Sequence, residues 1–228
     1  MDTWVGALWV LGAYLAGTLP STYLVARARH GAAVIAASKR TASESDAHLL
    51  ITEHLGGGWS ALAATLDVGK GLAYSLVAQR FGDVPPLWLA LVGVAIVVGH
   101  CWPPYARAMA GRGLSAASGV LLALLPIEMV IAGLVIVVGV VFRVTGPAST
   151  LALASVPVVA AIRGEPAAYA AMGAAILAVT VLRRLEGVGG VVAEGVPRGR
   201  ALYYRAVWDL SSPPRGPHRT EGEARTPS

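Results

Sequence analysis

The chain has 228 residues, of which 55% are hydrophobic and only 14% are charged, and its mean hydropathy is +0.63. A soluble domain normally carries about a quarter charged residues, so this composition excludes an ordinary soluble domain and indicates an integral membrane protein. The net charge of +5 does not favour nucleic acid, because the basic residues flank apolar segments and no nucleic-acid-binding signature is present. The single cysteine, Cys101, excludes an internal disulfide and a Cys-rich zinc site, and we expect no metal and no cofactor.

The first apolar segment runs from Trp4 to about Val25 and begins almost at the N-terminus. No basic stretch precedes it and no clear cleavage site follows it, so we expect a retained membrane helix and not a signal peptide. Gly17 and Pro20 lie inside this segment, which membrane helices tolerate when neighbouring groups satisfy the freed backbone. A polar loop over Arg27–Gly58 is expected next.

Two further membrane helices are predicted before the middle of the chain. The first covers Trp59 to about Val77 and the second covers Leu87 to about Trp102, with a turn over Phe81–Pro86 between them. Apolar runs of this length favour helices that cross a bilayer. A short basic loop rich in glycine, Pro103–Gly113, follows.

The apolar stretch Leu114–Phe142 is too long for one simple crossing. Pro126 and Glu128 divide it, so we predict two helices there, of which the first is short. Two more helices are expected over Ser149–Ile162 and Ala167–Leu182. The predicted fold class is therefore an all-α integral membrane protein with about seven transmembrane helices, and five or six are the alternatives.

The basic residues favour seven helices and set their orientation. With seven crossings nearly all of the Arg and Lys residues between helices fall on one side, whereas five or six crossings would scatter them. Because cytoplasmic loops are rich in Arg and Lys, we expect the rich side to be cytoplasmic and the N-terminus to be outside, in the plasma (inner) membrane. The rich side carries Arg27, Arg29, Lys39, Arg40, Arg107, Arg112, Arg143, Arg183 and Arg184, and the other side carries Arg80 and Arg163.

Residues 1–186 are thus predicted to form one helical membrane domain, and residues 187–228 a cytoplasmic tail. The tail is basic, is rich in Gly and Pro, and has no long apolar periodicity, so we expect most of it to be disordered. Within it, Arg200–Leu210 mixes aromatic residues with Arg. For this stretch, the alternative to disorder is a position at the membrane surface.

Polar residues in the second and third helices are candidates for chemistry. Asp67 and Lys70 lie three residues apart on one helical face. Charges inside a membrane span usually face the bundle or water, although a mutually satisfied structural pair is an equally good reading. His100, at a helix end, is suited to moving a proton near neutral pH.

The loop after His100 has features of a phosphate site. Gly111 and Gly113 allow the backbone to approach an anion, and Arg112 between them presents a fork of hydrogen-bond donors. Taken alone, this loop fits a tight basic turn between two helices at least as well. The earlier loop Lys39–Asp46 offers positive charge and hydroxyl groups but no glycine, and on its own it reads as a solvated loop.

Three segments, in order, resemble the bacterial acyl-phosphate-dependent glycerol-3-phosphate acyltransferases. Residues 13–24 read AYLAGTLPSTYL, close to the family's AYLLGSIPFGYL, and residues 67–71 match its DxxKG. Residues 99–122 follow its GHxFPxFxKFKGGKGxATxxGVLL without a gap, and the resemblance extends over about residues 8–187. The positions that coincide in the third segment are Gly99, His100, Pro103, Gly111, Gly113 and Gly119, while Arg107 and Arg112 replace lysines.

The resemblance implies transfer of an acyl chain from acyl phosphate to the 1-hydroxyl of glycerol 3-phosphate, which gives lysophosphatidic acid for phospholipid synthesis. The implied partners are these two substrates and membrane lipids, while the oligomeric state is not indicated. By the same resemblance, Ser43 and His100 are expected to be catalytic and Asp67 to position Lys70. The residues expected to bind substrate phosphate are Lys70, Arg107, Gly111, Arg112 and Gly113.

The chain also departs from the family's pattern. The family's first cytoplasmic motif, SGNxGATN, corresponds to Ser43–Leu50, where only the serine is kept, and Glu53 stands where an arginine belongs. Acids in place of a glycine-rich phosphate cradle repel phosphate. The family's HREN corresponds to Leu177–Thr180, and Gly146 stands where a serine is usual, although Ser149 fits.

These departures leave two alternatives to an active acyltransferase. The first is a catalytically degenerate paralogue that binds lipid or phosphate and regulates a partner enzyme. The second is a small transporter. The intact second motif favours the enzyme, whereas the eroded first motif favours the paralogue.

Overall fold

The computed structural model describes residues 2–29, 47–105, 110–186, 188–193 and 195–209, and these residues are almost entirely helical, with no strand among them. The helices are α1 (Thr3–Gly17), α2 (Ser21–Ala28), α4 (Ala47–Leu55), α5 (Gly57–Phe81), α6 (Pro86–Cys101), α7 (Leu114–Leu124), α8 (Pro126–Val141), α9 (Thr145–Ile162), α10 (Ala167–Leu185), α11 (Val188–Ala193) and α12 (Arg198–Val207).

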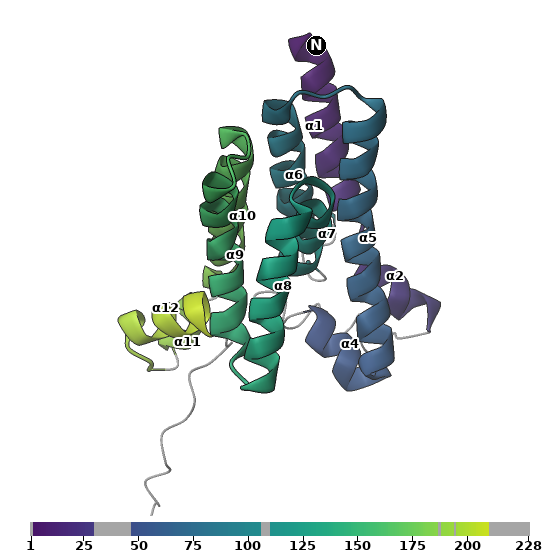
Figure 1. The fold of residues 1–228 in the computed structure, drawn as a ribbon. Helices are drawn as coiled ribbons and strands as arrows, with labels where there is room; N and C mark the ends of the chain where they lie inside the picture. Colours follow the sequence, from purple (N-terminus) through teal and green to yellow (C-terminus); the bar gives the residue numbers. More distant parts are fainter. Residues whose placement is uncertain (1, 30–46, 106–109, 187, 194, 210–228) are drawn as a thin grey trace, which may run out of the picture.

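The long helices run roughly along one direction and form a bundle (Figure 1). Helix α5 packs most closely against α7, α1 against α6, and α9 against both α8 and α10. The N-terminus lies at one end of the bundle, and the short helices α2, α4, α11 and α12 lie toward the other end (Figure 1). This arrangement gives the bundle two different ends, of which the second carries the short helices.

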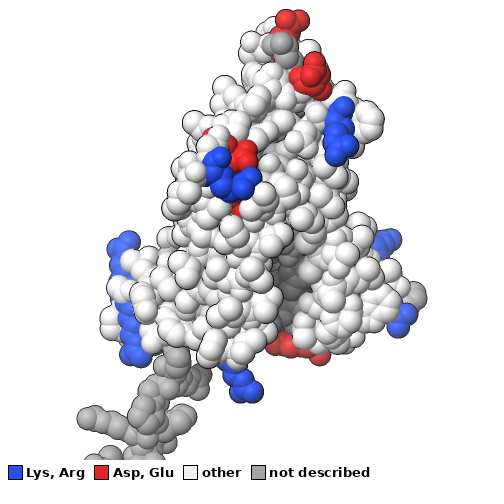
Figure 2. Space-filling view, in the orientation of Figure 1, with Lys and Arg blue, Asp and Glu red and all other residues white. Residues whose placement is uncertain are grey.

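Large apolar side chains cover much of the bundle's outer surface. Three helical stretches are long and apolar enough to cross a membrane, namely 3–28, 57–81 and 145–162, and three shorter apolar helices are α6, α7 and α8. On the face seen in Figure 2, charged side chains are few and lie in separate small groups, and most of the surface is uncharged. Exposed apolar surface of this extent is unfavourable in water and favourable in lipid. The prediction of an all-helical membrane protein is confirmed.

Glycines let two pairs of helices approach backbone to backbone. A Cβ atom at Gly119 on α7 would lie 2.0 Å from the carbonyl oxygen of Val68 on α5, and one at Gly17 on α1 would lie 2.2 Å from that of Ile96 on α6. Small residues at such crossings are typical of membrane helix packing, where close van der Waals contact replaces the hydrophobic effect. The positions of α5 and α6, which carry the polar residues described below, therefore depend on these glycines.

The structure corrects two predicted boundaries and confirms a third. The first predicted span is interrupted, because α1 ends at Gly17 and α2 begins at Ser21; Pro20, just before α2, lacks the N–H that would continue the helix. The expected polar loop before the second span contains a helix, α4. The predicted division at Pro126 is confirmed, since Pro126 is the first residue of α8, a position that proline favours.

The described part of the predicted tail is helical, although most of the tail is expected from the sequence to be disordered. Helices α11 and α12 fold back on the bundle and bury Val191, Ala201 and Arg205. The guanidinium of Arg205 donates hydrogen bonds to the carbonyl oxygens of Arg184, at 2.8 Å, and Glu186 at the end of α10. The described part of the tail thus contacts the bundle through polar groups, which a search for an apolar face does not detect. Residues 210–228 lie outside the described residues.

Candidate active site

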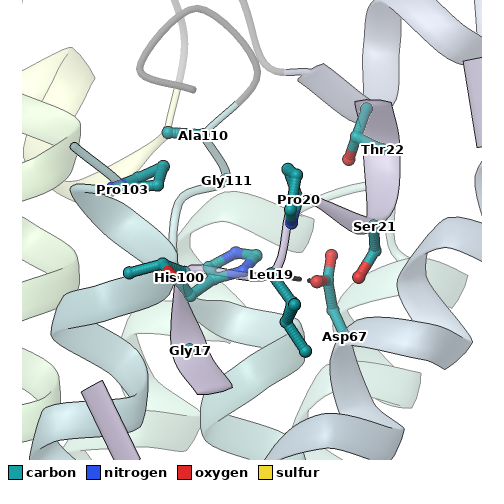
Figure 3. Close-up of a pocket in the computed structure, with 11 residues that line it drawn as sticks. Gly17, Leu19, Pro20, Ser21, Thr22, Asp67, His100, Pro103, Ala110 and Gly111 are labelled. Atoms are coloured by element: carbon teal, nitrogen blue, oxygen red, sulfur yellow. Dashed lines mark ion pairs between the residues drawn. The ribbon is translucent and has the colours of Figure 1, made fainter. Parts of the chain in front are cut away.

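Three ionisable side chains meet inside the bundle where α1 breaks. Asp67 on α5 and His100 at the end of α6 face each other there (Figure 3). Asp67 Oδ1 lies 2.8 Å from Lys70 Nζ and 3.4 Å from His100 Nδ1. The exposed fraction of the side chain is 1% for Asp67, 8% for Lys70 and 6% for His100. A buried carboxylate is costly unless charge and hydrogen bonds compensate it. The structure therefore joins the DxxKG segment to His100 as one polar cluster.

Lys70 also holds the broken end of α1. Its ammonium donates a hydrogen bond of 2.8 Å to the carbonyl oxygen of Leu19. Carbonyl groups at a helix end lack partners within the helix and need an external donor. Two of the three ammonium donors thus point to Asp67 and Leu19, so Lys70 has a structural role, and its contact with substrate phosphate stays a prediction.

A small polar cavity borders Asp67 and His100 (Figure 3). It is lined on one side by the 17–22 segment at the α1 break and on the other by Pro103, Ala110 and Gly111, and its volume is about 10 Å³. That volume holds roughly one water molecule. The hydroxyl-bearing residues Ser21 and Thr22 line it and are buried; we did not single them out from the sequence, although they lie in the first segment of the family resemblance.

The glycines of the basic loop have packing roles in this site. A Cβ at Gly111 would lie 2.0 Å from His100 Nε2, so the imidazole fits only because residue 111 has no side chain. Gly113 precedes α7 with a φ of +93°, a left-handed conformation that favours glycine. The loop thus packs directly against His100, and phosphate binding by its glycines stays a prediction.

A second polar cluster surrounds Arg184 at the end of α10. Arg184 is 3% exposed, and its guanidinium donates to Thr150 Oγ1 at 2.7 Å and Ser149 Oγ at 3.0 Å, both on α9. Asp209 Oδ1 lies 3.5 Å from Arg184 Nε and connects Arg112 to this cluster. Arg112 Nη1 donates a hydrogen bond of 2.8 Å to the backbone oxygen of Asp209 and one of 2.6 Å to its Oδ1. We refer to Arg112, Ser149, Thr150, Arg184 and Asp209 as the arginine cluster.

The two clusters lie on either side of the basic loop. Arg183 Nε donates to the carbonyl oxygen of Gly111 at 3.3 Å, which ties the end of α10 to the loop beside His100. From the sequence, Arg183 and Arg184 are recognisable only as markers of membrane orientation. A count of charges cannot show that one of two adjacent arginines turns inward, so Arg184 was missed as a site residue.

Other predicted residues are not brought into either cluster by the described structure. Ser43 and Arg107 lie outside the described residues, so their predicted roles stay predictions. Glu53 is on α4 with an exposed side chain. At the position of the family's HREN, Thr180 is buried and donates only to Leu177 O, at 2.8 Å, within its own helix.

This fold and site define a helical membrane protein with a buried Asp–Lys–His cluster beside a basic glycine-rich loop. A family model described as glycerol-3-phosphate acyltransferase matches residues 7–189, and the chain belongs to this family. The match ends before α12. The predicted family, and with it the prediction of a membrane acyltransferase, is confirmed.

Individual relatives agree with the family model. The glycerol-3-phosphate acyltransferase of Rubrobacter xylanophilus is 33% identical to this chain over 71% of this chain and 79% of the relative. That of a Nitratiruptor species is 29% identical over 54% of this chain and 60% of the relative. The crystal structure of PlsY, an integral membrane glycerol 3-phosphate acyltransferase, in its glycerol 3-phosphate form is similar with a TM-score of 0.69, at 25% identity, over 83% of this chain and 92% of PlsY.

Proposed function

We propose that the chain transfers an acyl chain from acyl phosphate to the 1-hydroxyl of glycerol 3-phosphate and releases lysophosphatidic acid and phosphate. The observation that carries this proposal is the buried cluster of Asp67, Lys70 and His100, in which two motif segments far apart in the sequence come together. The named activity of the relatives and the glycerol 3-phosphate form of PlsY support the acceptor.

The chemistry needs a proton acceptor and positive charge. The acceptor hydroxyl oxygen bonds to the acyl carbonyl carbon, the carbon–oxygen bond to phosphate breaks, and the hydroxyl proton must leave. In this proposal His100 takes that proton through Nε2, while Asp67 beside Nδ1 orients the ring and stabilises the imidazolium that forms. Arg112 and Lys70 bind phosphate groups and offset their charge.

Substrate binding requires the site to open. The cavity beside His100 holds about one water molecule, which is too little room for a phosphate group. In this proposal the turn around Pro20 and the loop around Pro103 separate to admit glycerol 3-phosphate. The acyl chain then lies among the apolar helices, where its burial is favourable.

We also propose seven membrane crossings with the N-terminus outside and both clusters at the cytoplasmic end of the plasma membrane. The support is the distribution of basic residues. Arg27, Arg143 and Arg184 follow or end helices at the end of the bundle away from the N-terminus, whereas Arg80 and Arg163 lie at the other end. That asymmetry is the one expected for a cytoplasmic face.

The test is an assay of purified protein in lipid with acyl phosphate and labelled glycerol 3-phosphate. We expect labelled lysophosphatidic acid and phosphate in equal amounts. His100→Ala should lower the rate by about 100-fold or more, because it removes the general base. The control is His54→Ala, since His54 lies exposed on α4. Equal loss in both variants would contradict the role of His100.

A second candidate is a non-catalytic paralogue that binds phosphate-bearing lipids or their precursors and regulates another enzyme. It is supported by the carboxylate of Asp209 on Arg112 and by Leu177 and Thr180 at the positions of the family's HREN. This candidate predicts saturable binding of glycerol 3-phosphate with no labelled product in the same assay.

A further inference from the structure

The end of the described tail inserts an acid between two arginines of the bundle. Asp209 Oδ1 lies 2.6 Å from Arg112 Nη1 and 3.5 Å from Arg184 Nε. Arg184 comes from α10 and Arg112 from the basic loop, while Asp209 follows α12, which lies outside the family match. A segment that follows the part of the chain matched by the family model thus supplies the carboxylate that contacts both guanidinium groups.

We propose that the described C-terminal segment, residues 188–193 and 195–209, is a built-in competitor of the substrate phosphate, with Asp209 occupying the anion position between Arg112 and Arg184. The inference rests on the proposed function, because it assigns Arg112 to substrate phosphate. It adds Arg184, Ser149 and Thr150 to that phosphate position. It also adds a means of control, since phosphate binds there only when Asp209 leaves.

The pairing of Asp209 with the arginines is imperfect, which favours exchange for a better anion. Among the described residues, the buried Nε of Arg184 has no hydrogen-bond partner, since its 3.5 Å contact with Asp209 is too long. A phosphate group carries about −1.5 to −2 and has more acceptor oxygens, so it satisfies both arginines and the hydroxyls of Ser149 and Thr150 more completely.

The segment is held in a way that permits release. Asp209 has a φ of +56°, a left-handed backbone conformation that costs a residue with a side chain about 1 kcal/mol or more. Val191 and Ala201 are its only buried apolar residues among those described, and Arg205 donates a hydrogen bond to the carbonyl oxygen of Arg184. Segments with few buried apolar contacts open at low free-energy cost.

The bundle is shaped to receive the segment. A Cβ atom at Gly146, in the first turn of α9, would lie 2.0 Å from the carbonyl oxygen of Trp208. Thr150 Oγ1, one turn further on, lies 3.4 Å from the carbonyl oxygen of Val207. Gly146 stands where the resembling family usually has a serine, so this chain lacks a side chain at the point where its own tail approaches most closely.

The experiment measures the affinity of the full-length protein for inorganic phosphate by calorimetry, against chloride at matched ionic strength. Asp209→Asn keeps the shape of the side chain and removes its charge, and we expect it to tighten phosphate binding by about tenfold or more. Gly146→Ala should do the same by pushing Trp208 away, without touching a charge. The control is Glu165→Gln, which removes one carboxylate beside Arg163 at the opposite end of the bundle and should leave the affinity unchanged.

Trypsin cleavage after Arg205, followed by mass spectrometry, reports the position of the segment independently of catalysis. Arg205 is 5% exposed, so cleavage should be slow in the docked segment and faster with phosphate or in Asp209→Asn. An unchanged phosphate affinity in Asp209→Asn would overturn the inference. If Arg112→Ala nevertheless abolished phosphate binding, the phosphate site of the proposed function would still be supported. Tightened phosphate binding in Asp209→Asn without acyl transfer by that variant would instead uphold the competitor and refute the proposed activity.

Discussion

Substitution of Gly111 by Ala tests whether the position of His100 matters without removing any reactive group. The new Cβ would lie 2.0 Å from His100 Nε2, and an ordinary contact of about 3.5 Å requires the ring to move by roughly 1 to 1.5 Å. The ring then loses its place beside Asp67, where the contact is already 3.4 Å long. Because displacements of about 1 Å can cost about 100-fold in rate, we expect Gly111→Ala to lower kcat by that order.

The assay is acyl transfer from acyl phosphate to labelled glycerol 3-phosphate, combined with thermal unfolding of the purified protein. The imidazole is the far end of a movable side chain, so Tm should change little. Gly69→Ala is the control, because a Cβ there meets nothing within 4 Å although Gly69 lies two residues from Asp67. In a His100→Ala background, Gly111→Ala should have no further effect. Full activity of Gly111→Ala with an unchanged Tm would refute the reasoning.

Two further predictions concern the fold and its orientation. Gly119→Ala should lower Tm, at a cost of about 1–3 kcal/mol in the free energy of unfolding, because its Cβ would meet the α5 backbone. Gly133→Ala on α8 should leave Tm unchanged, because a Cβ there meets nothing within 4 Å. Equal Tm values for the two variants would contradict the close helix crossing. In a Cys101→Ser background, Asp83→Cys between α5 and α6 should react with an impermeant thiol reagent from outside the cell, and Arg143→Cys between α8 and α9 should react only after permeabilisation. The reverse pattern would invert the proposed orientation.

The positions of the helices were predictable where one property of the sequence, such as an apolar run or a proline, determines where a helix lies or begins. Long apolar runs gave the positions of the membrane helices, and proline gave the division between α7 and α8, since Pro126 begins α8. The break in the first span was harder, because Gly17 and Pro20 are also compatible with a continuous membrane helix. At the break, the carbonyl oxygen of Leu19 accepts a hydrogen bond from Lys70, a tertiary contact that sequence periodicity does not contain.

The site was only partly predictable from the residues. The spacing of Asp67 and Lys70 on one helical face follows from helical geometry, but their meeting with His100 depends on how α5 packs on α6 and was suggested only by the family resemblance. The arginine cluster was missed for a different reason. Its members come from the loop, two helices and the tail, and the tail docks through polar contacts such as Arg205 to Arg184 O, which hydrophobic patterning does not reveal.

Formation of labelled lysophosphatidic acid by the purified protein, from acyl phosphate and glycerol 3-phosphate, tests the central claim most directly. The measurement is made on the wild-type chain and on Asp209→Asn, so that restraint by the tail is not mistaken for lack of activity. We predict product from both proteins, with phosphate released in equal amount, and loss of product in His100→Ala. Binding of glycerol 3-phosphate with no product from either protein would contradict the claim and favour the non-catalytic paralogue.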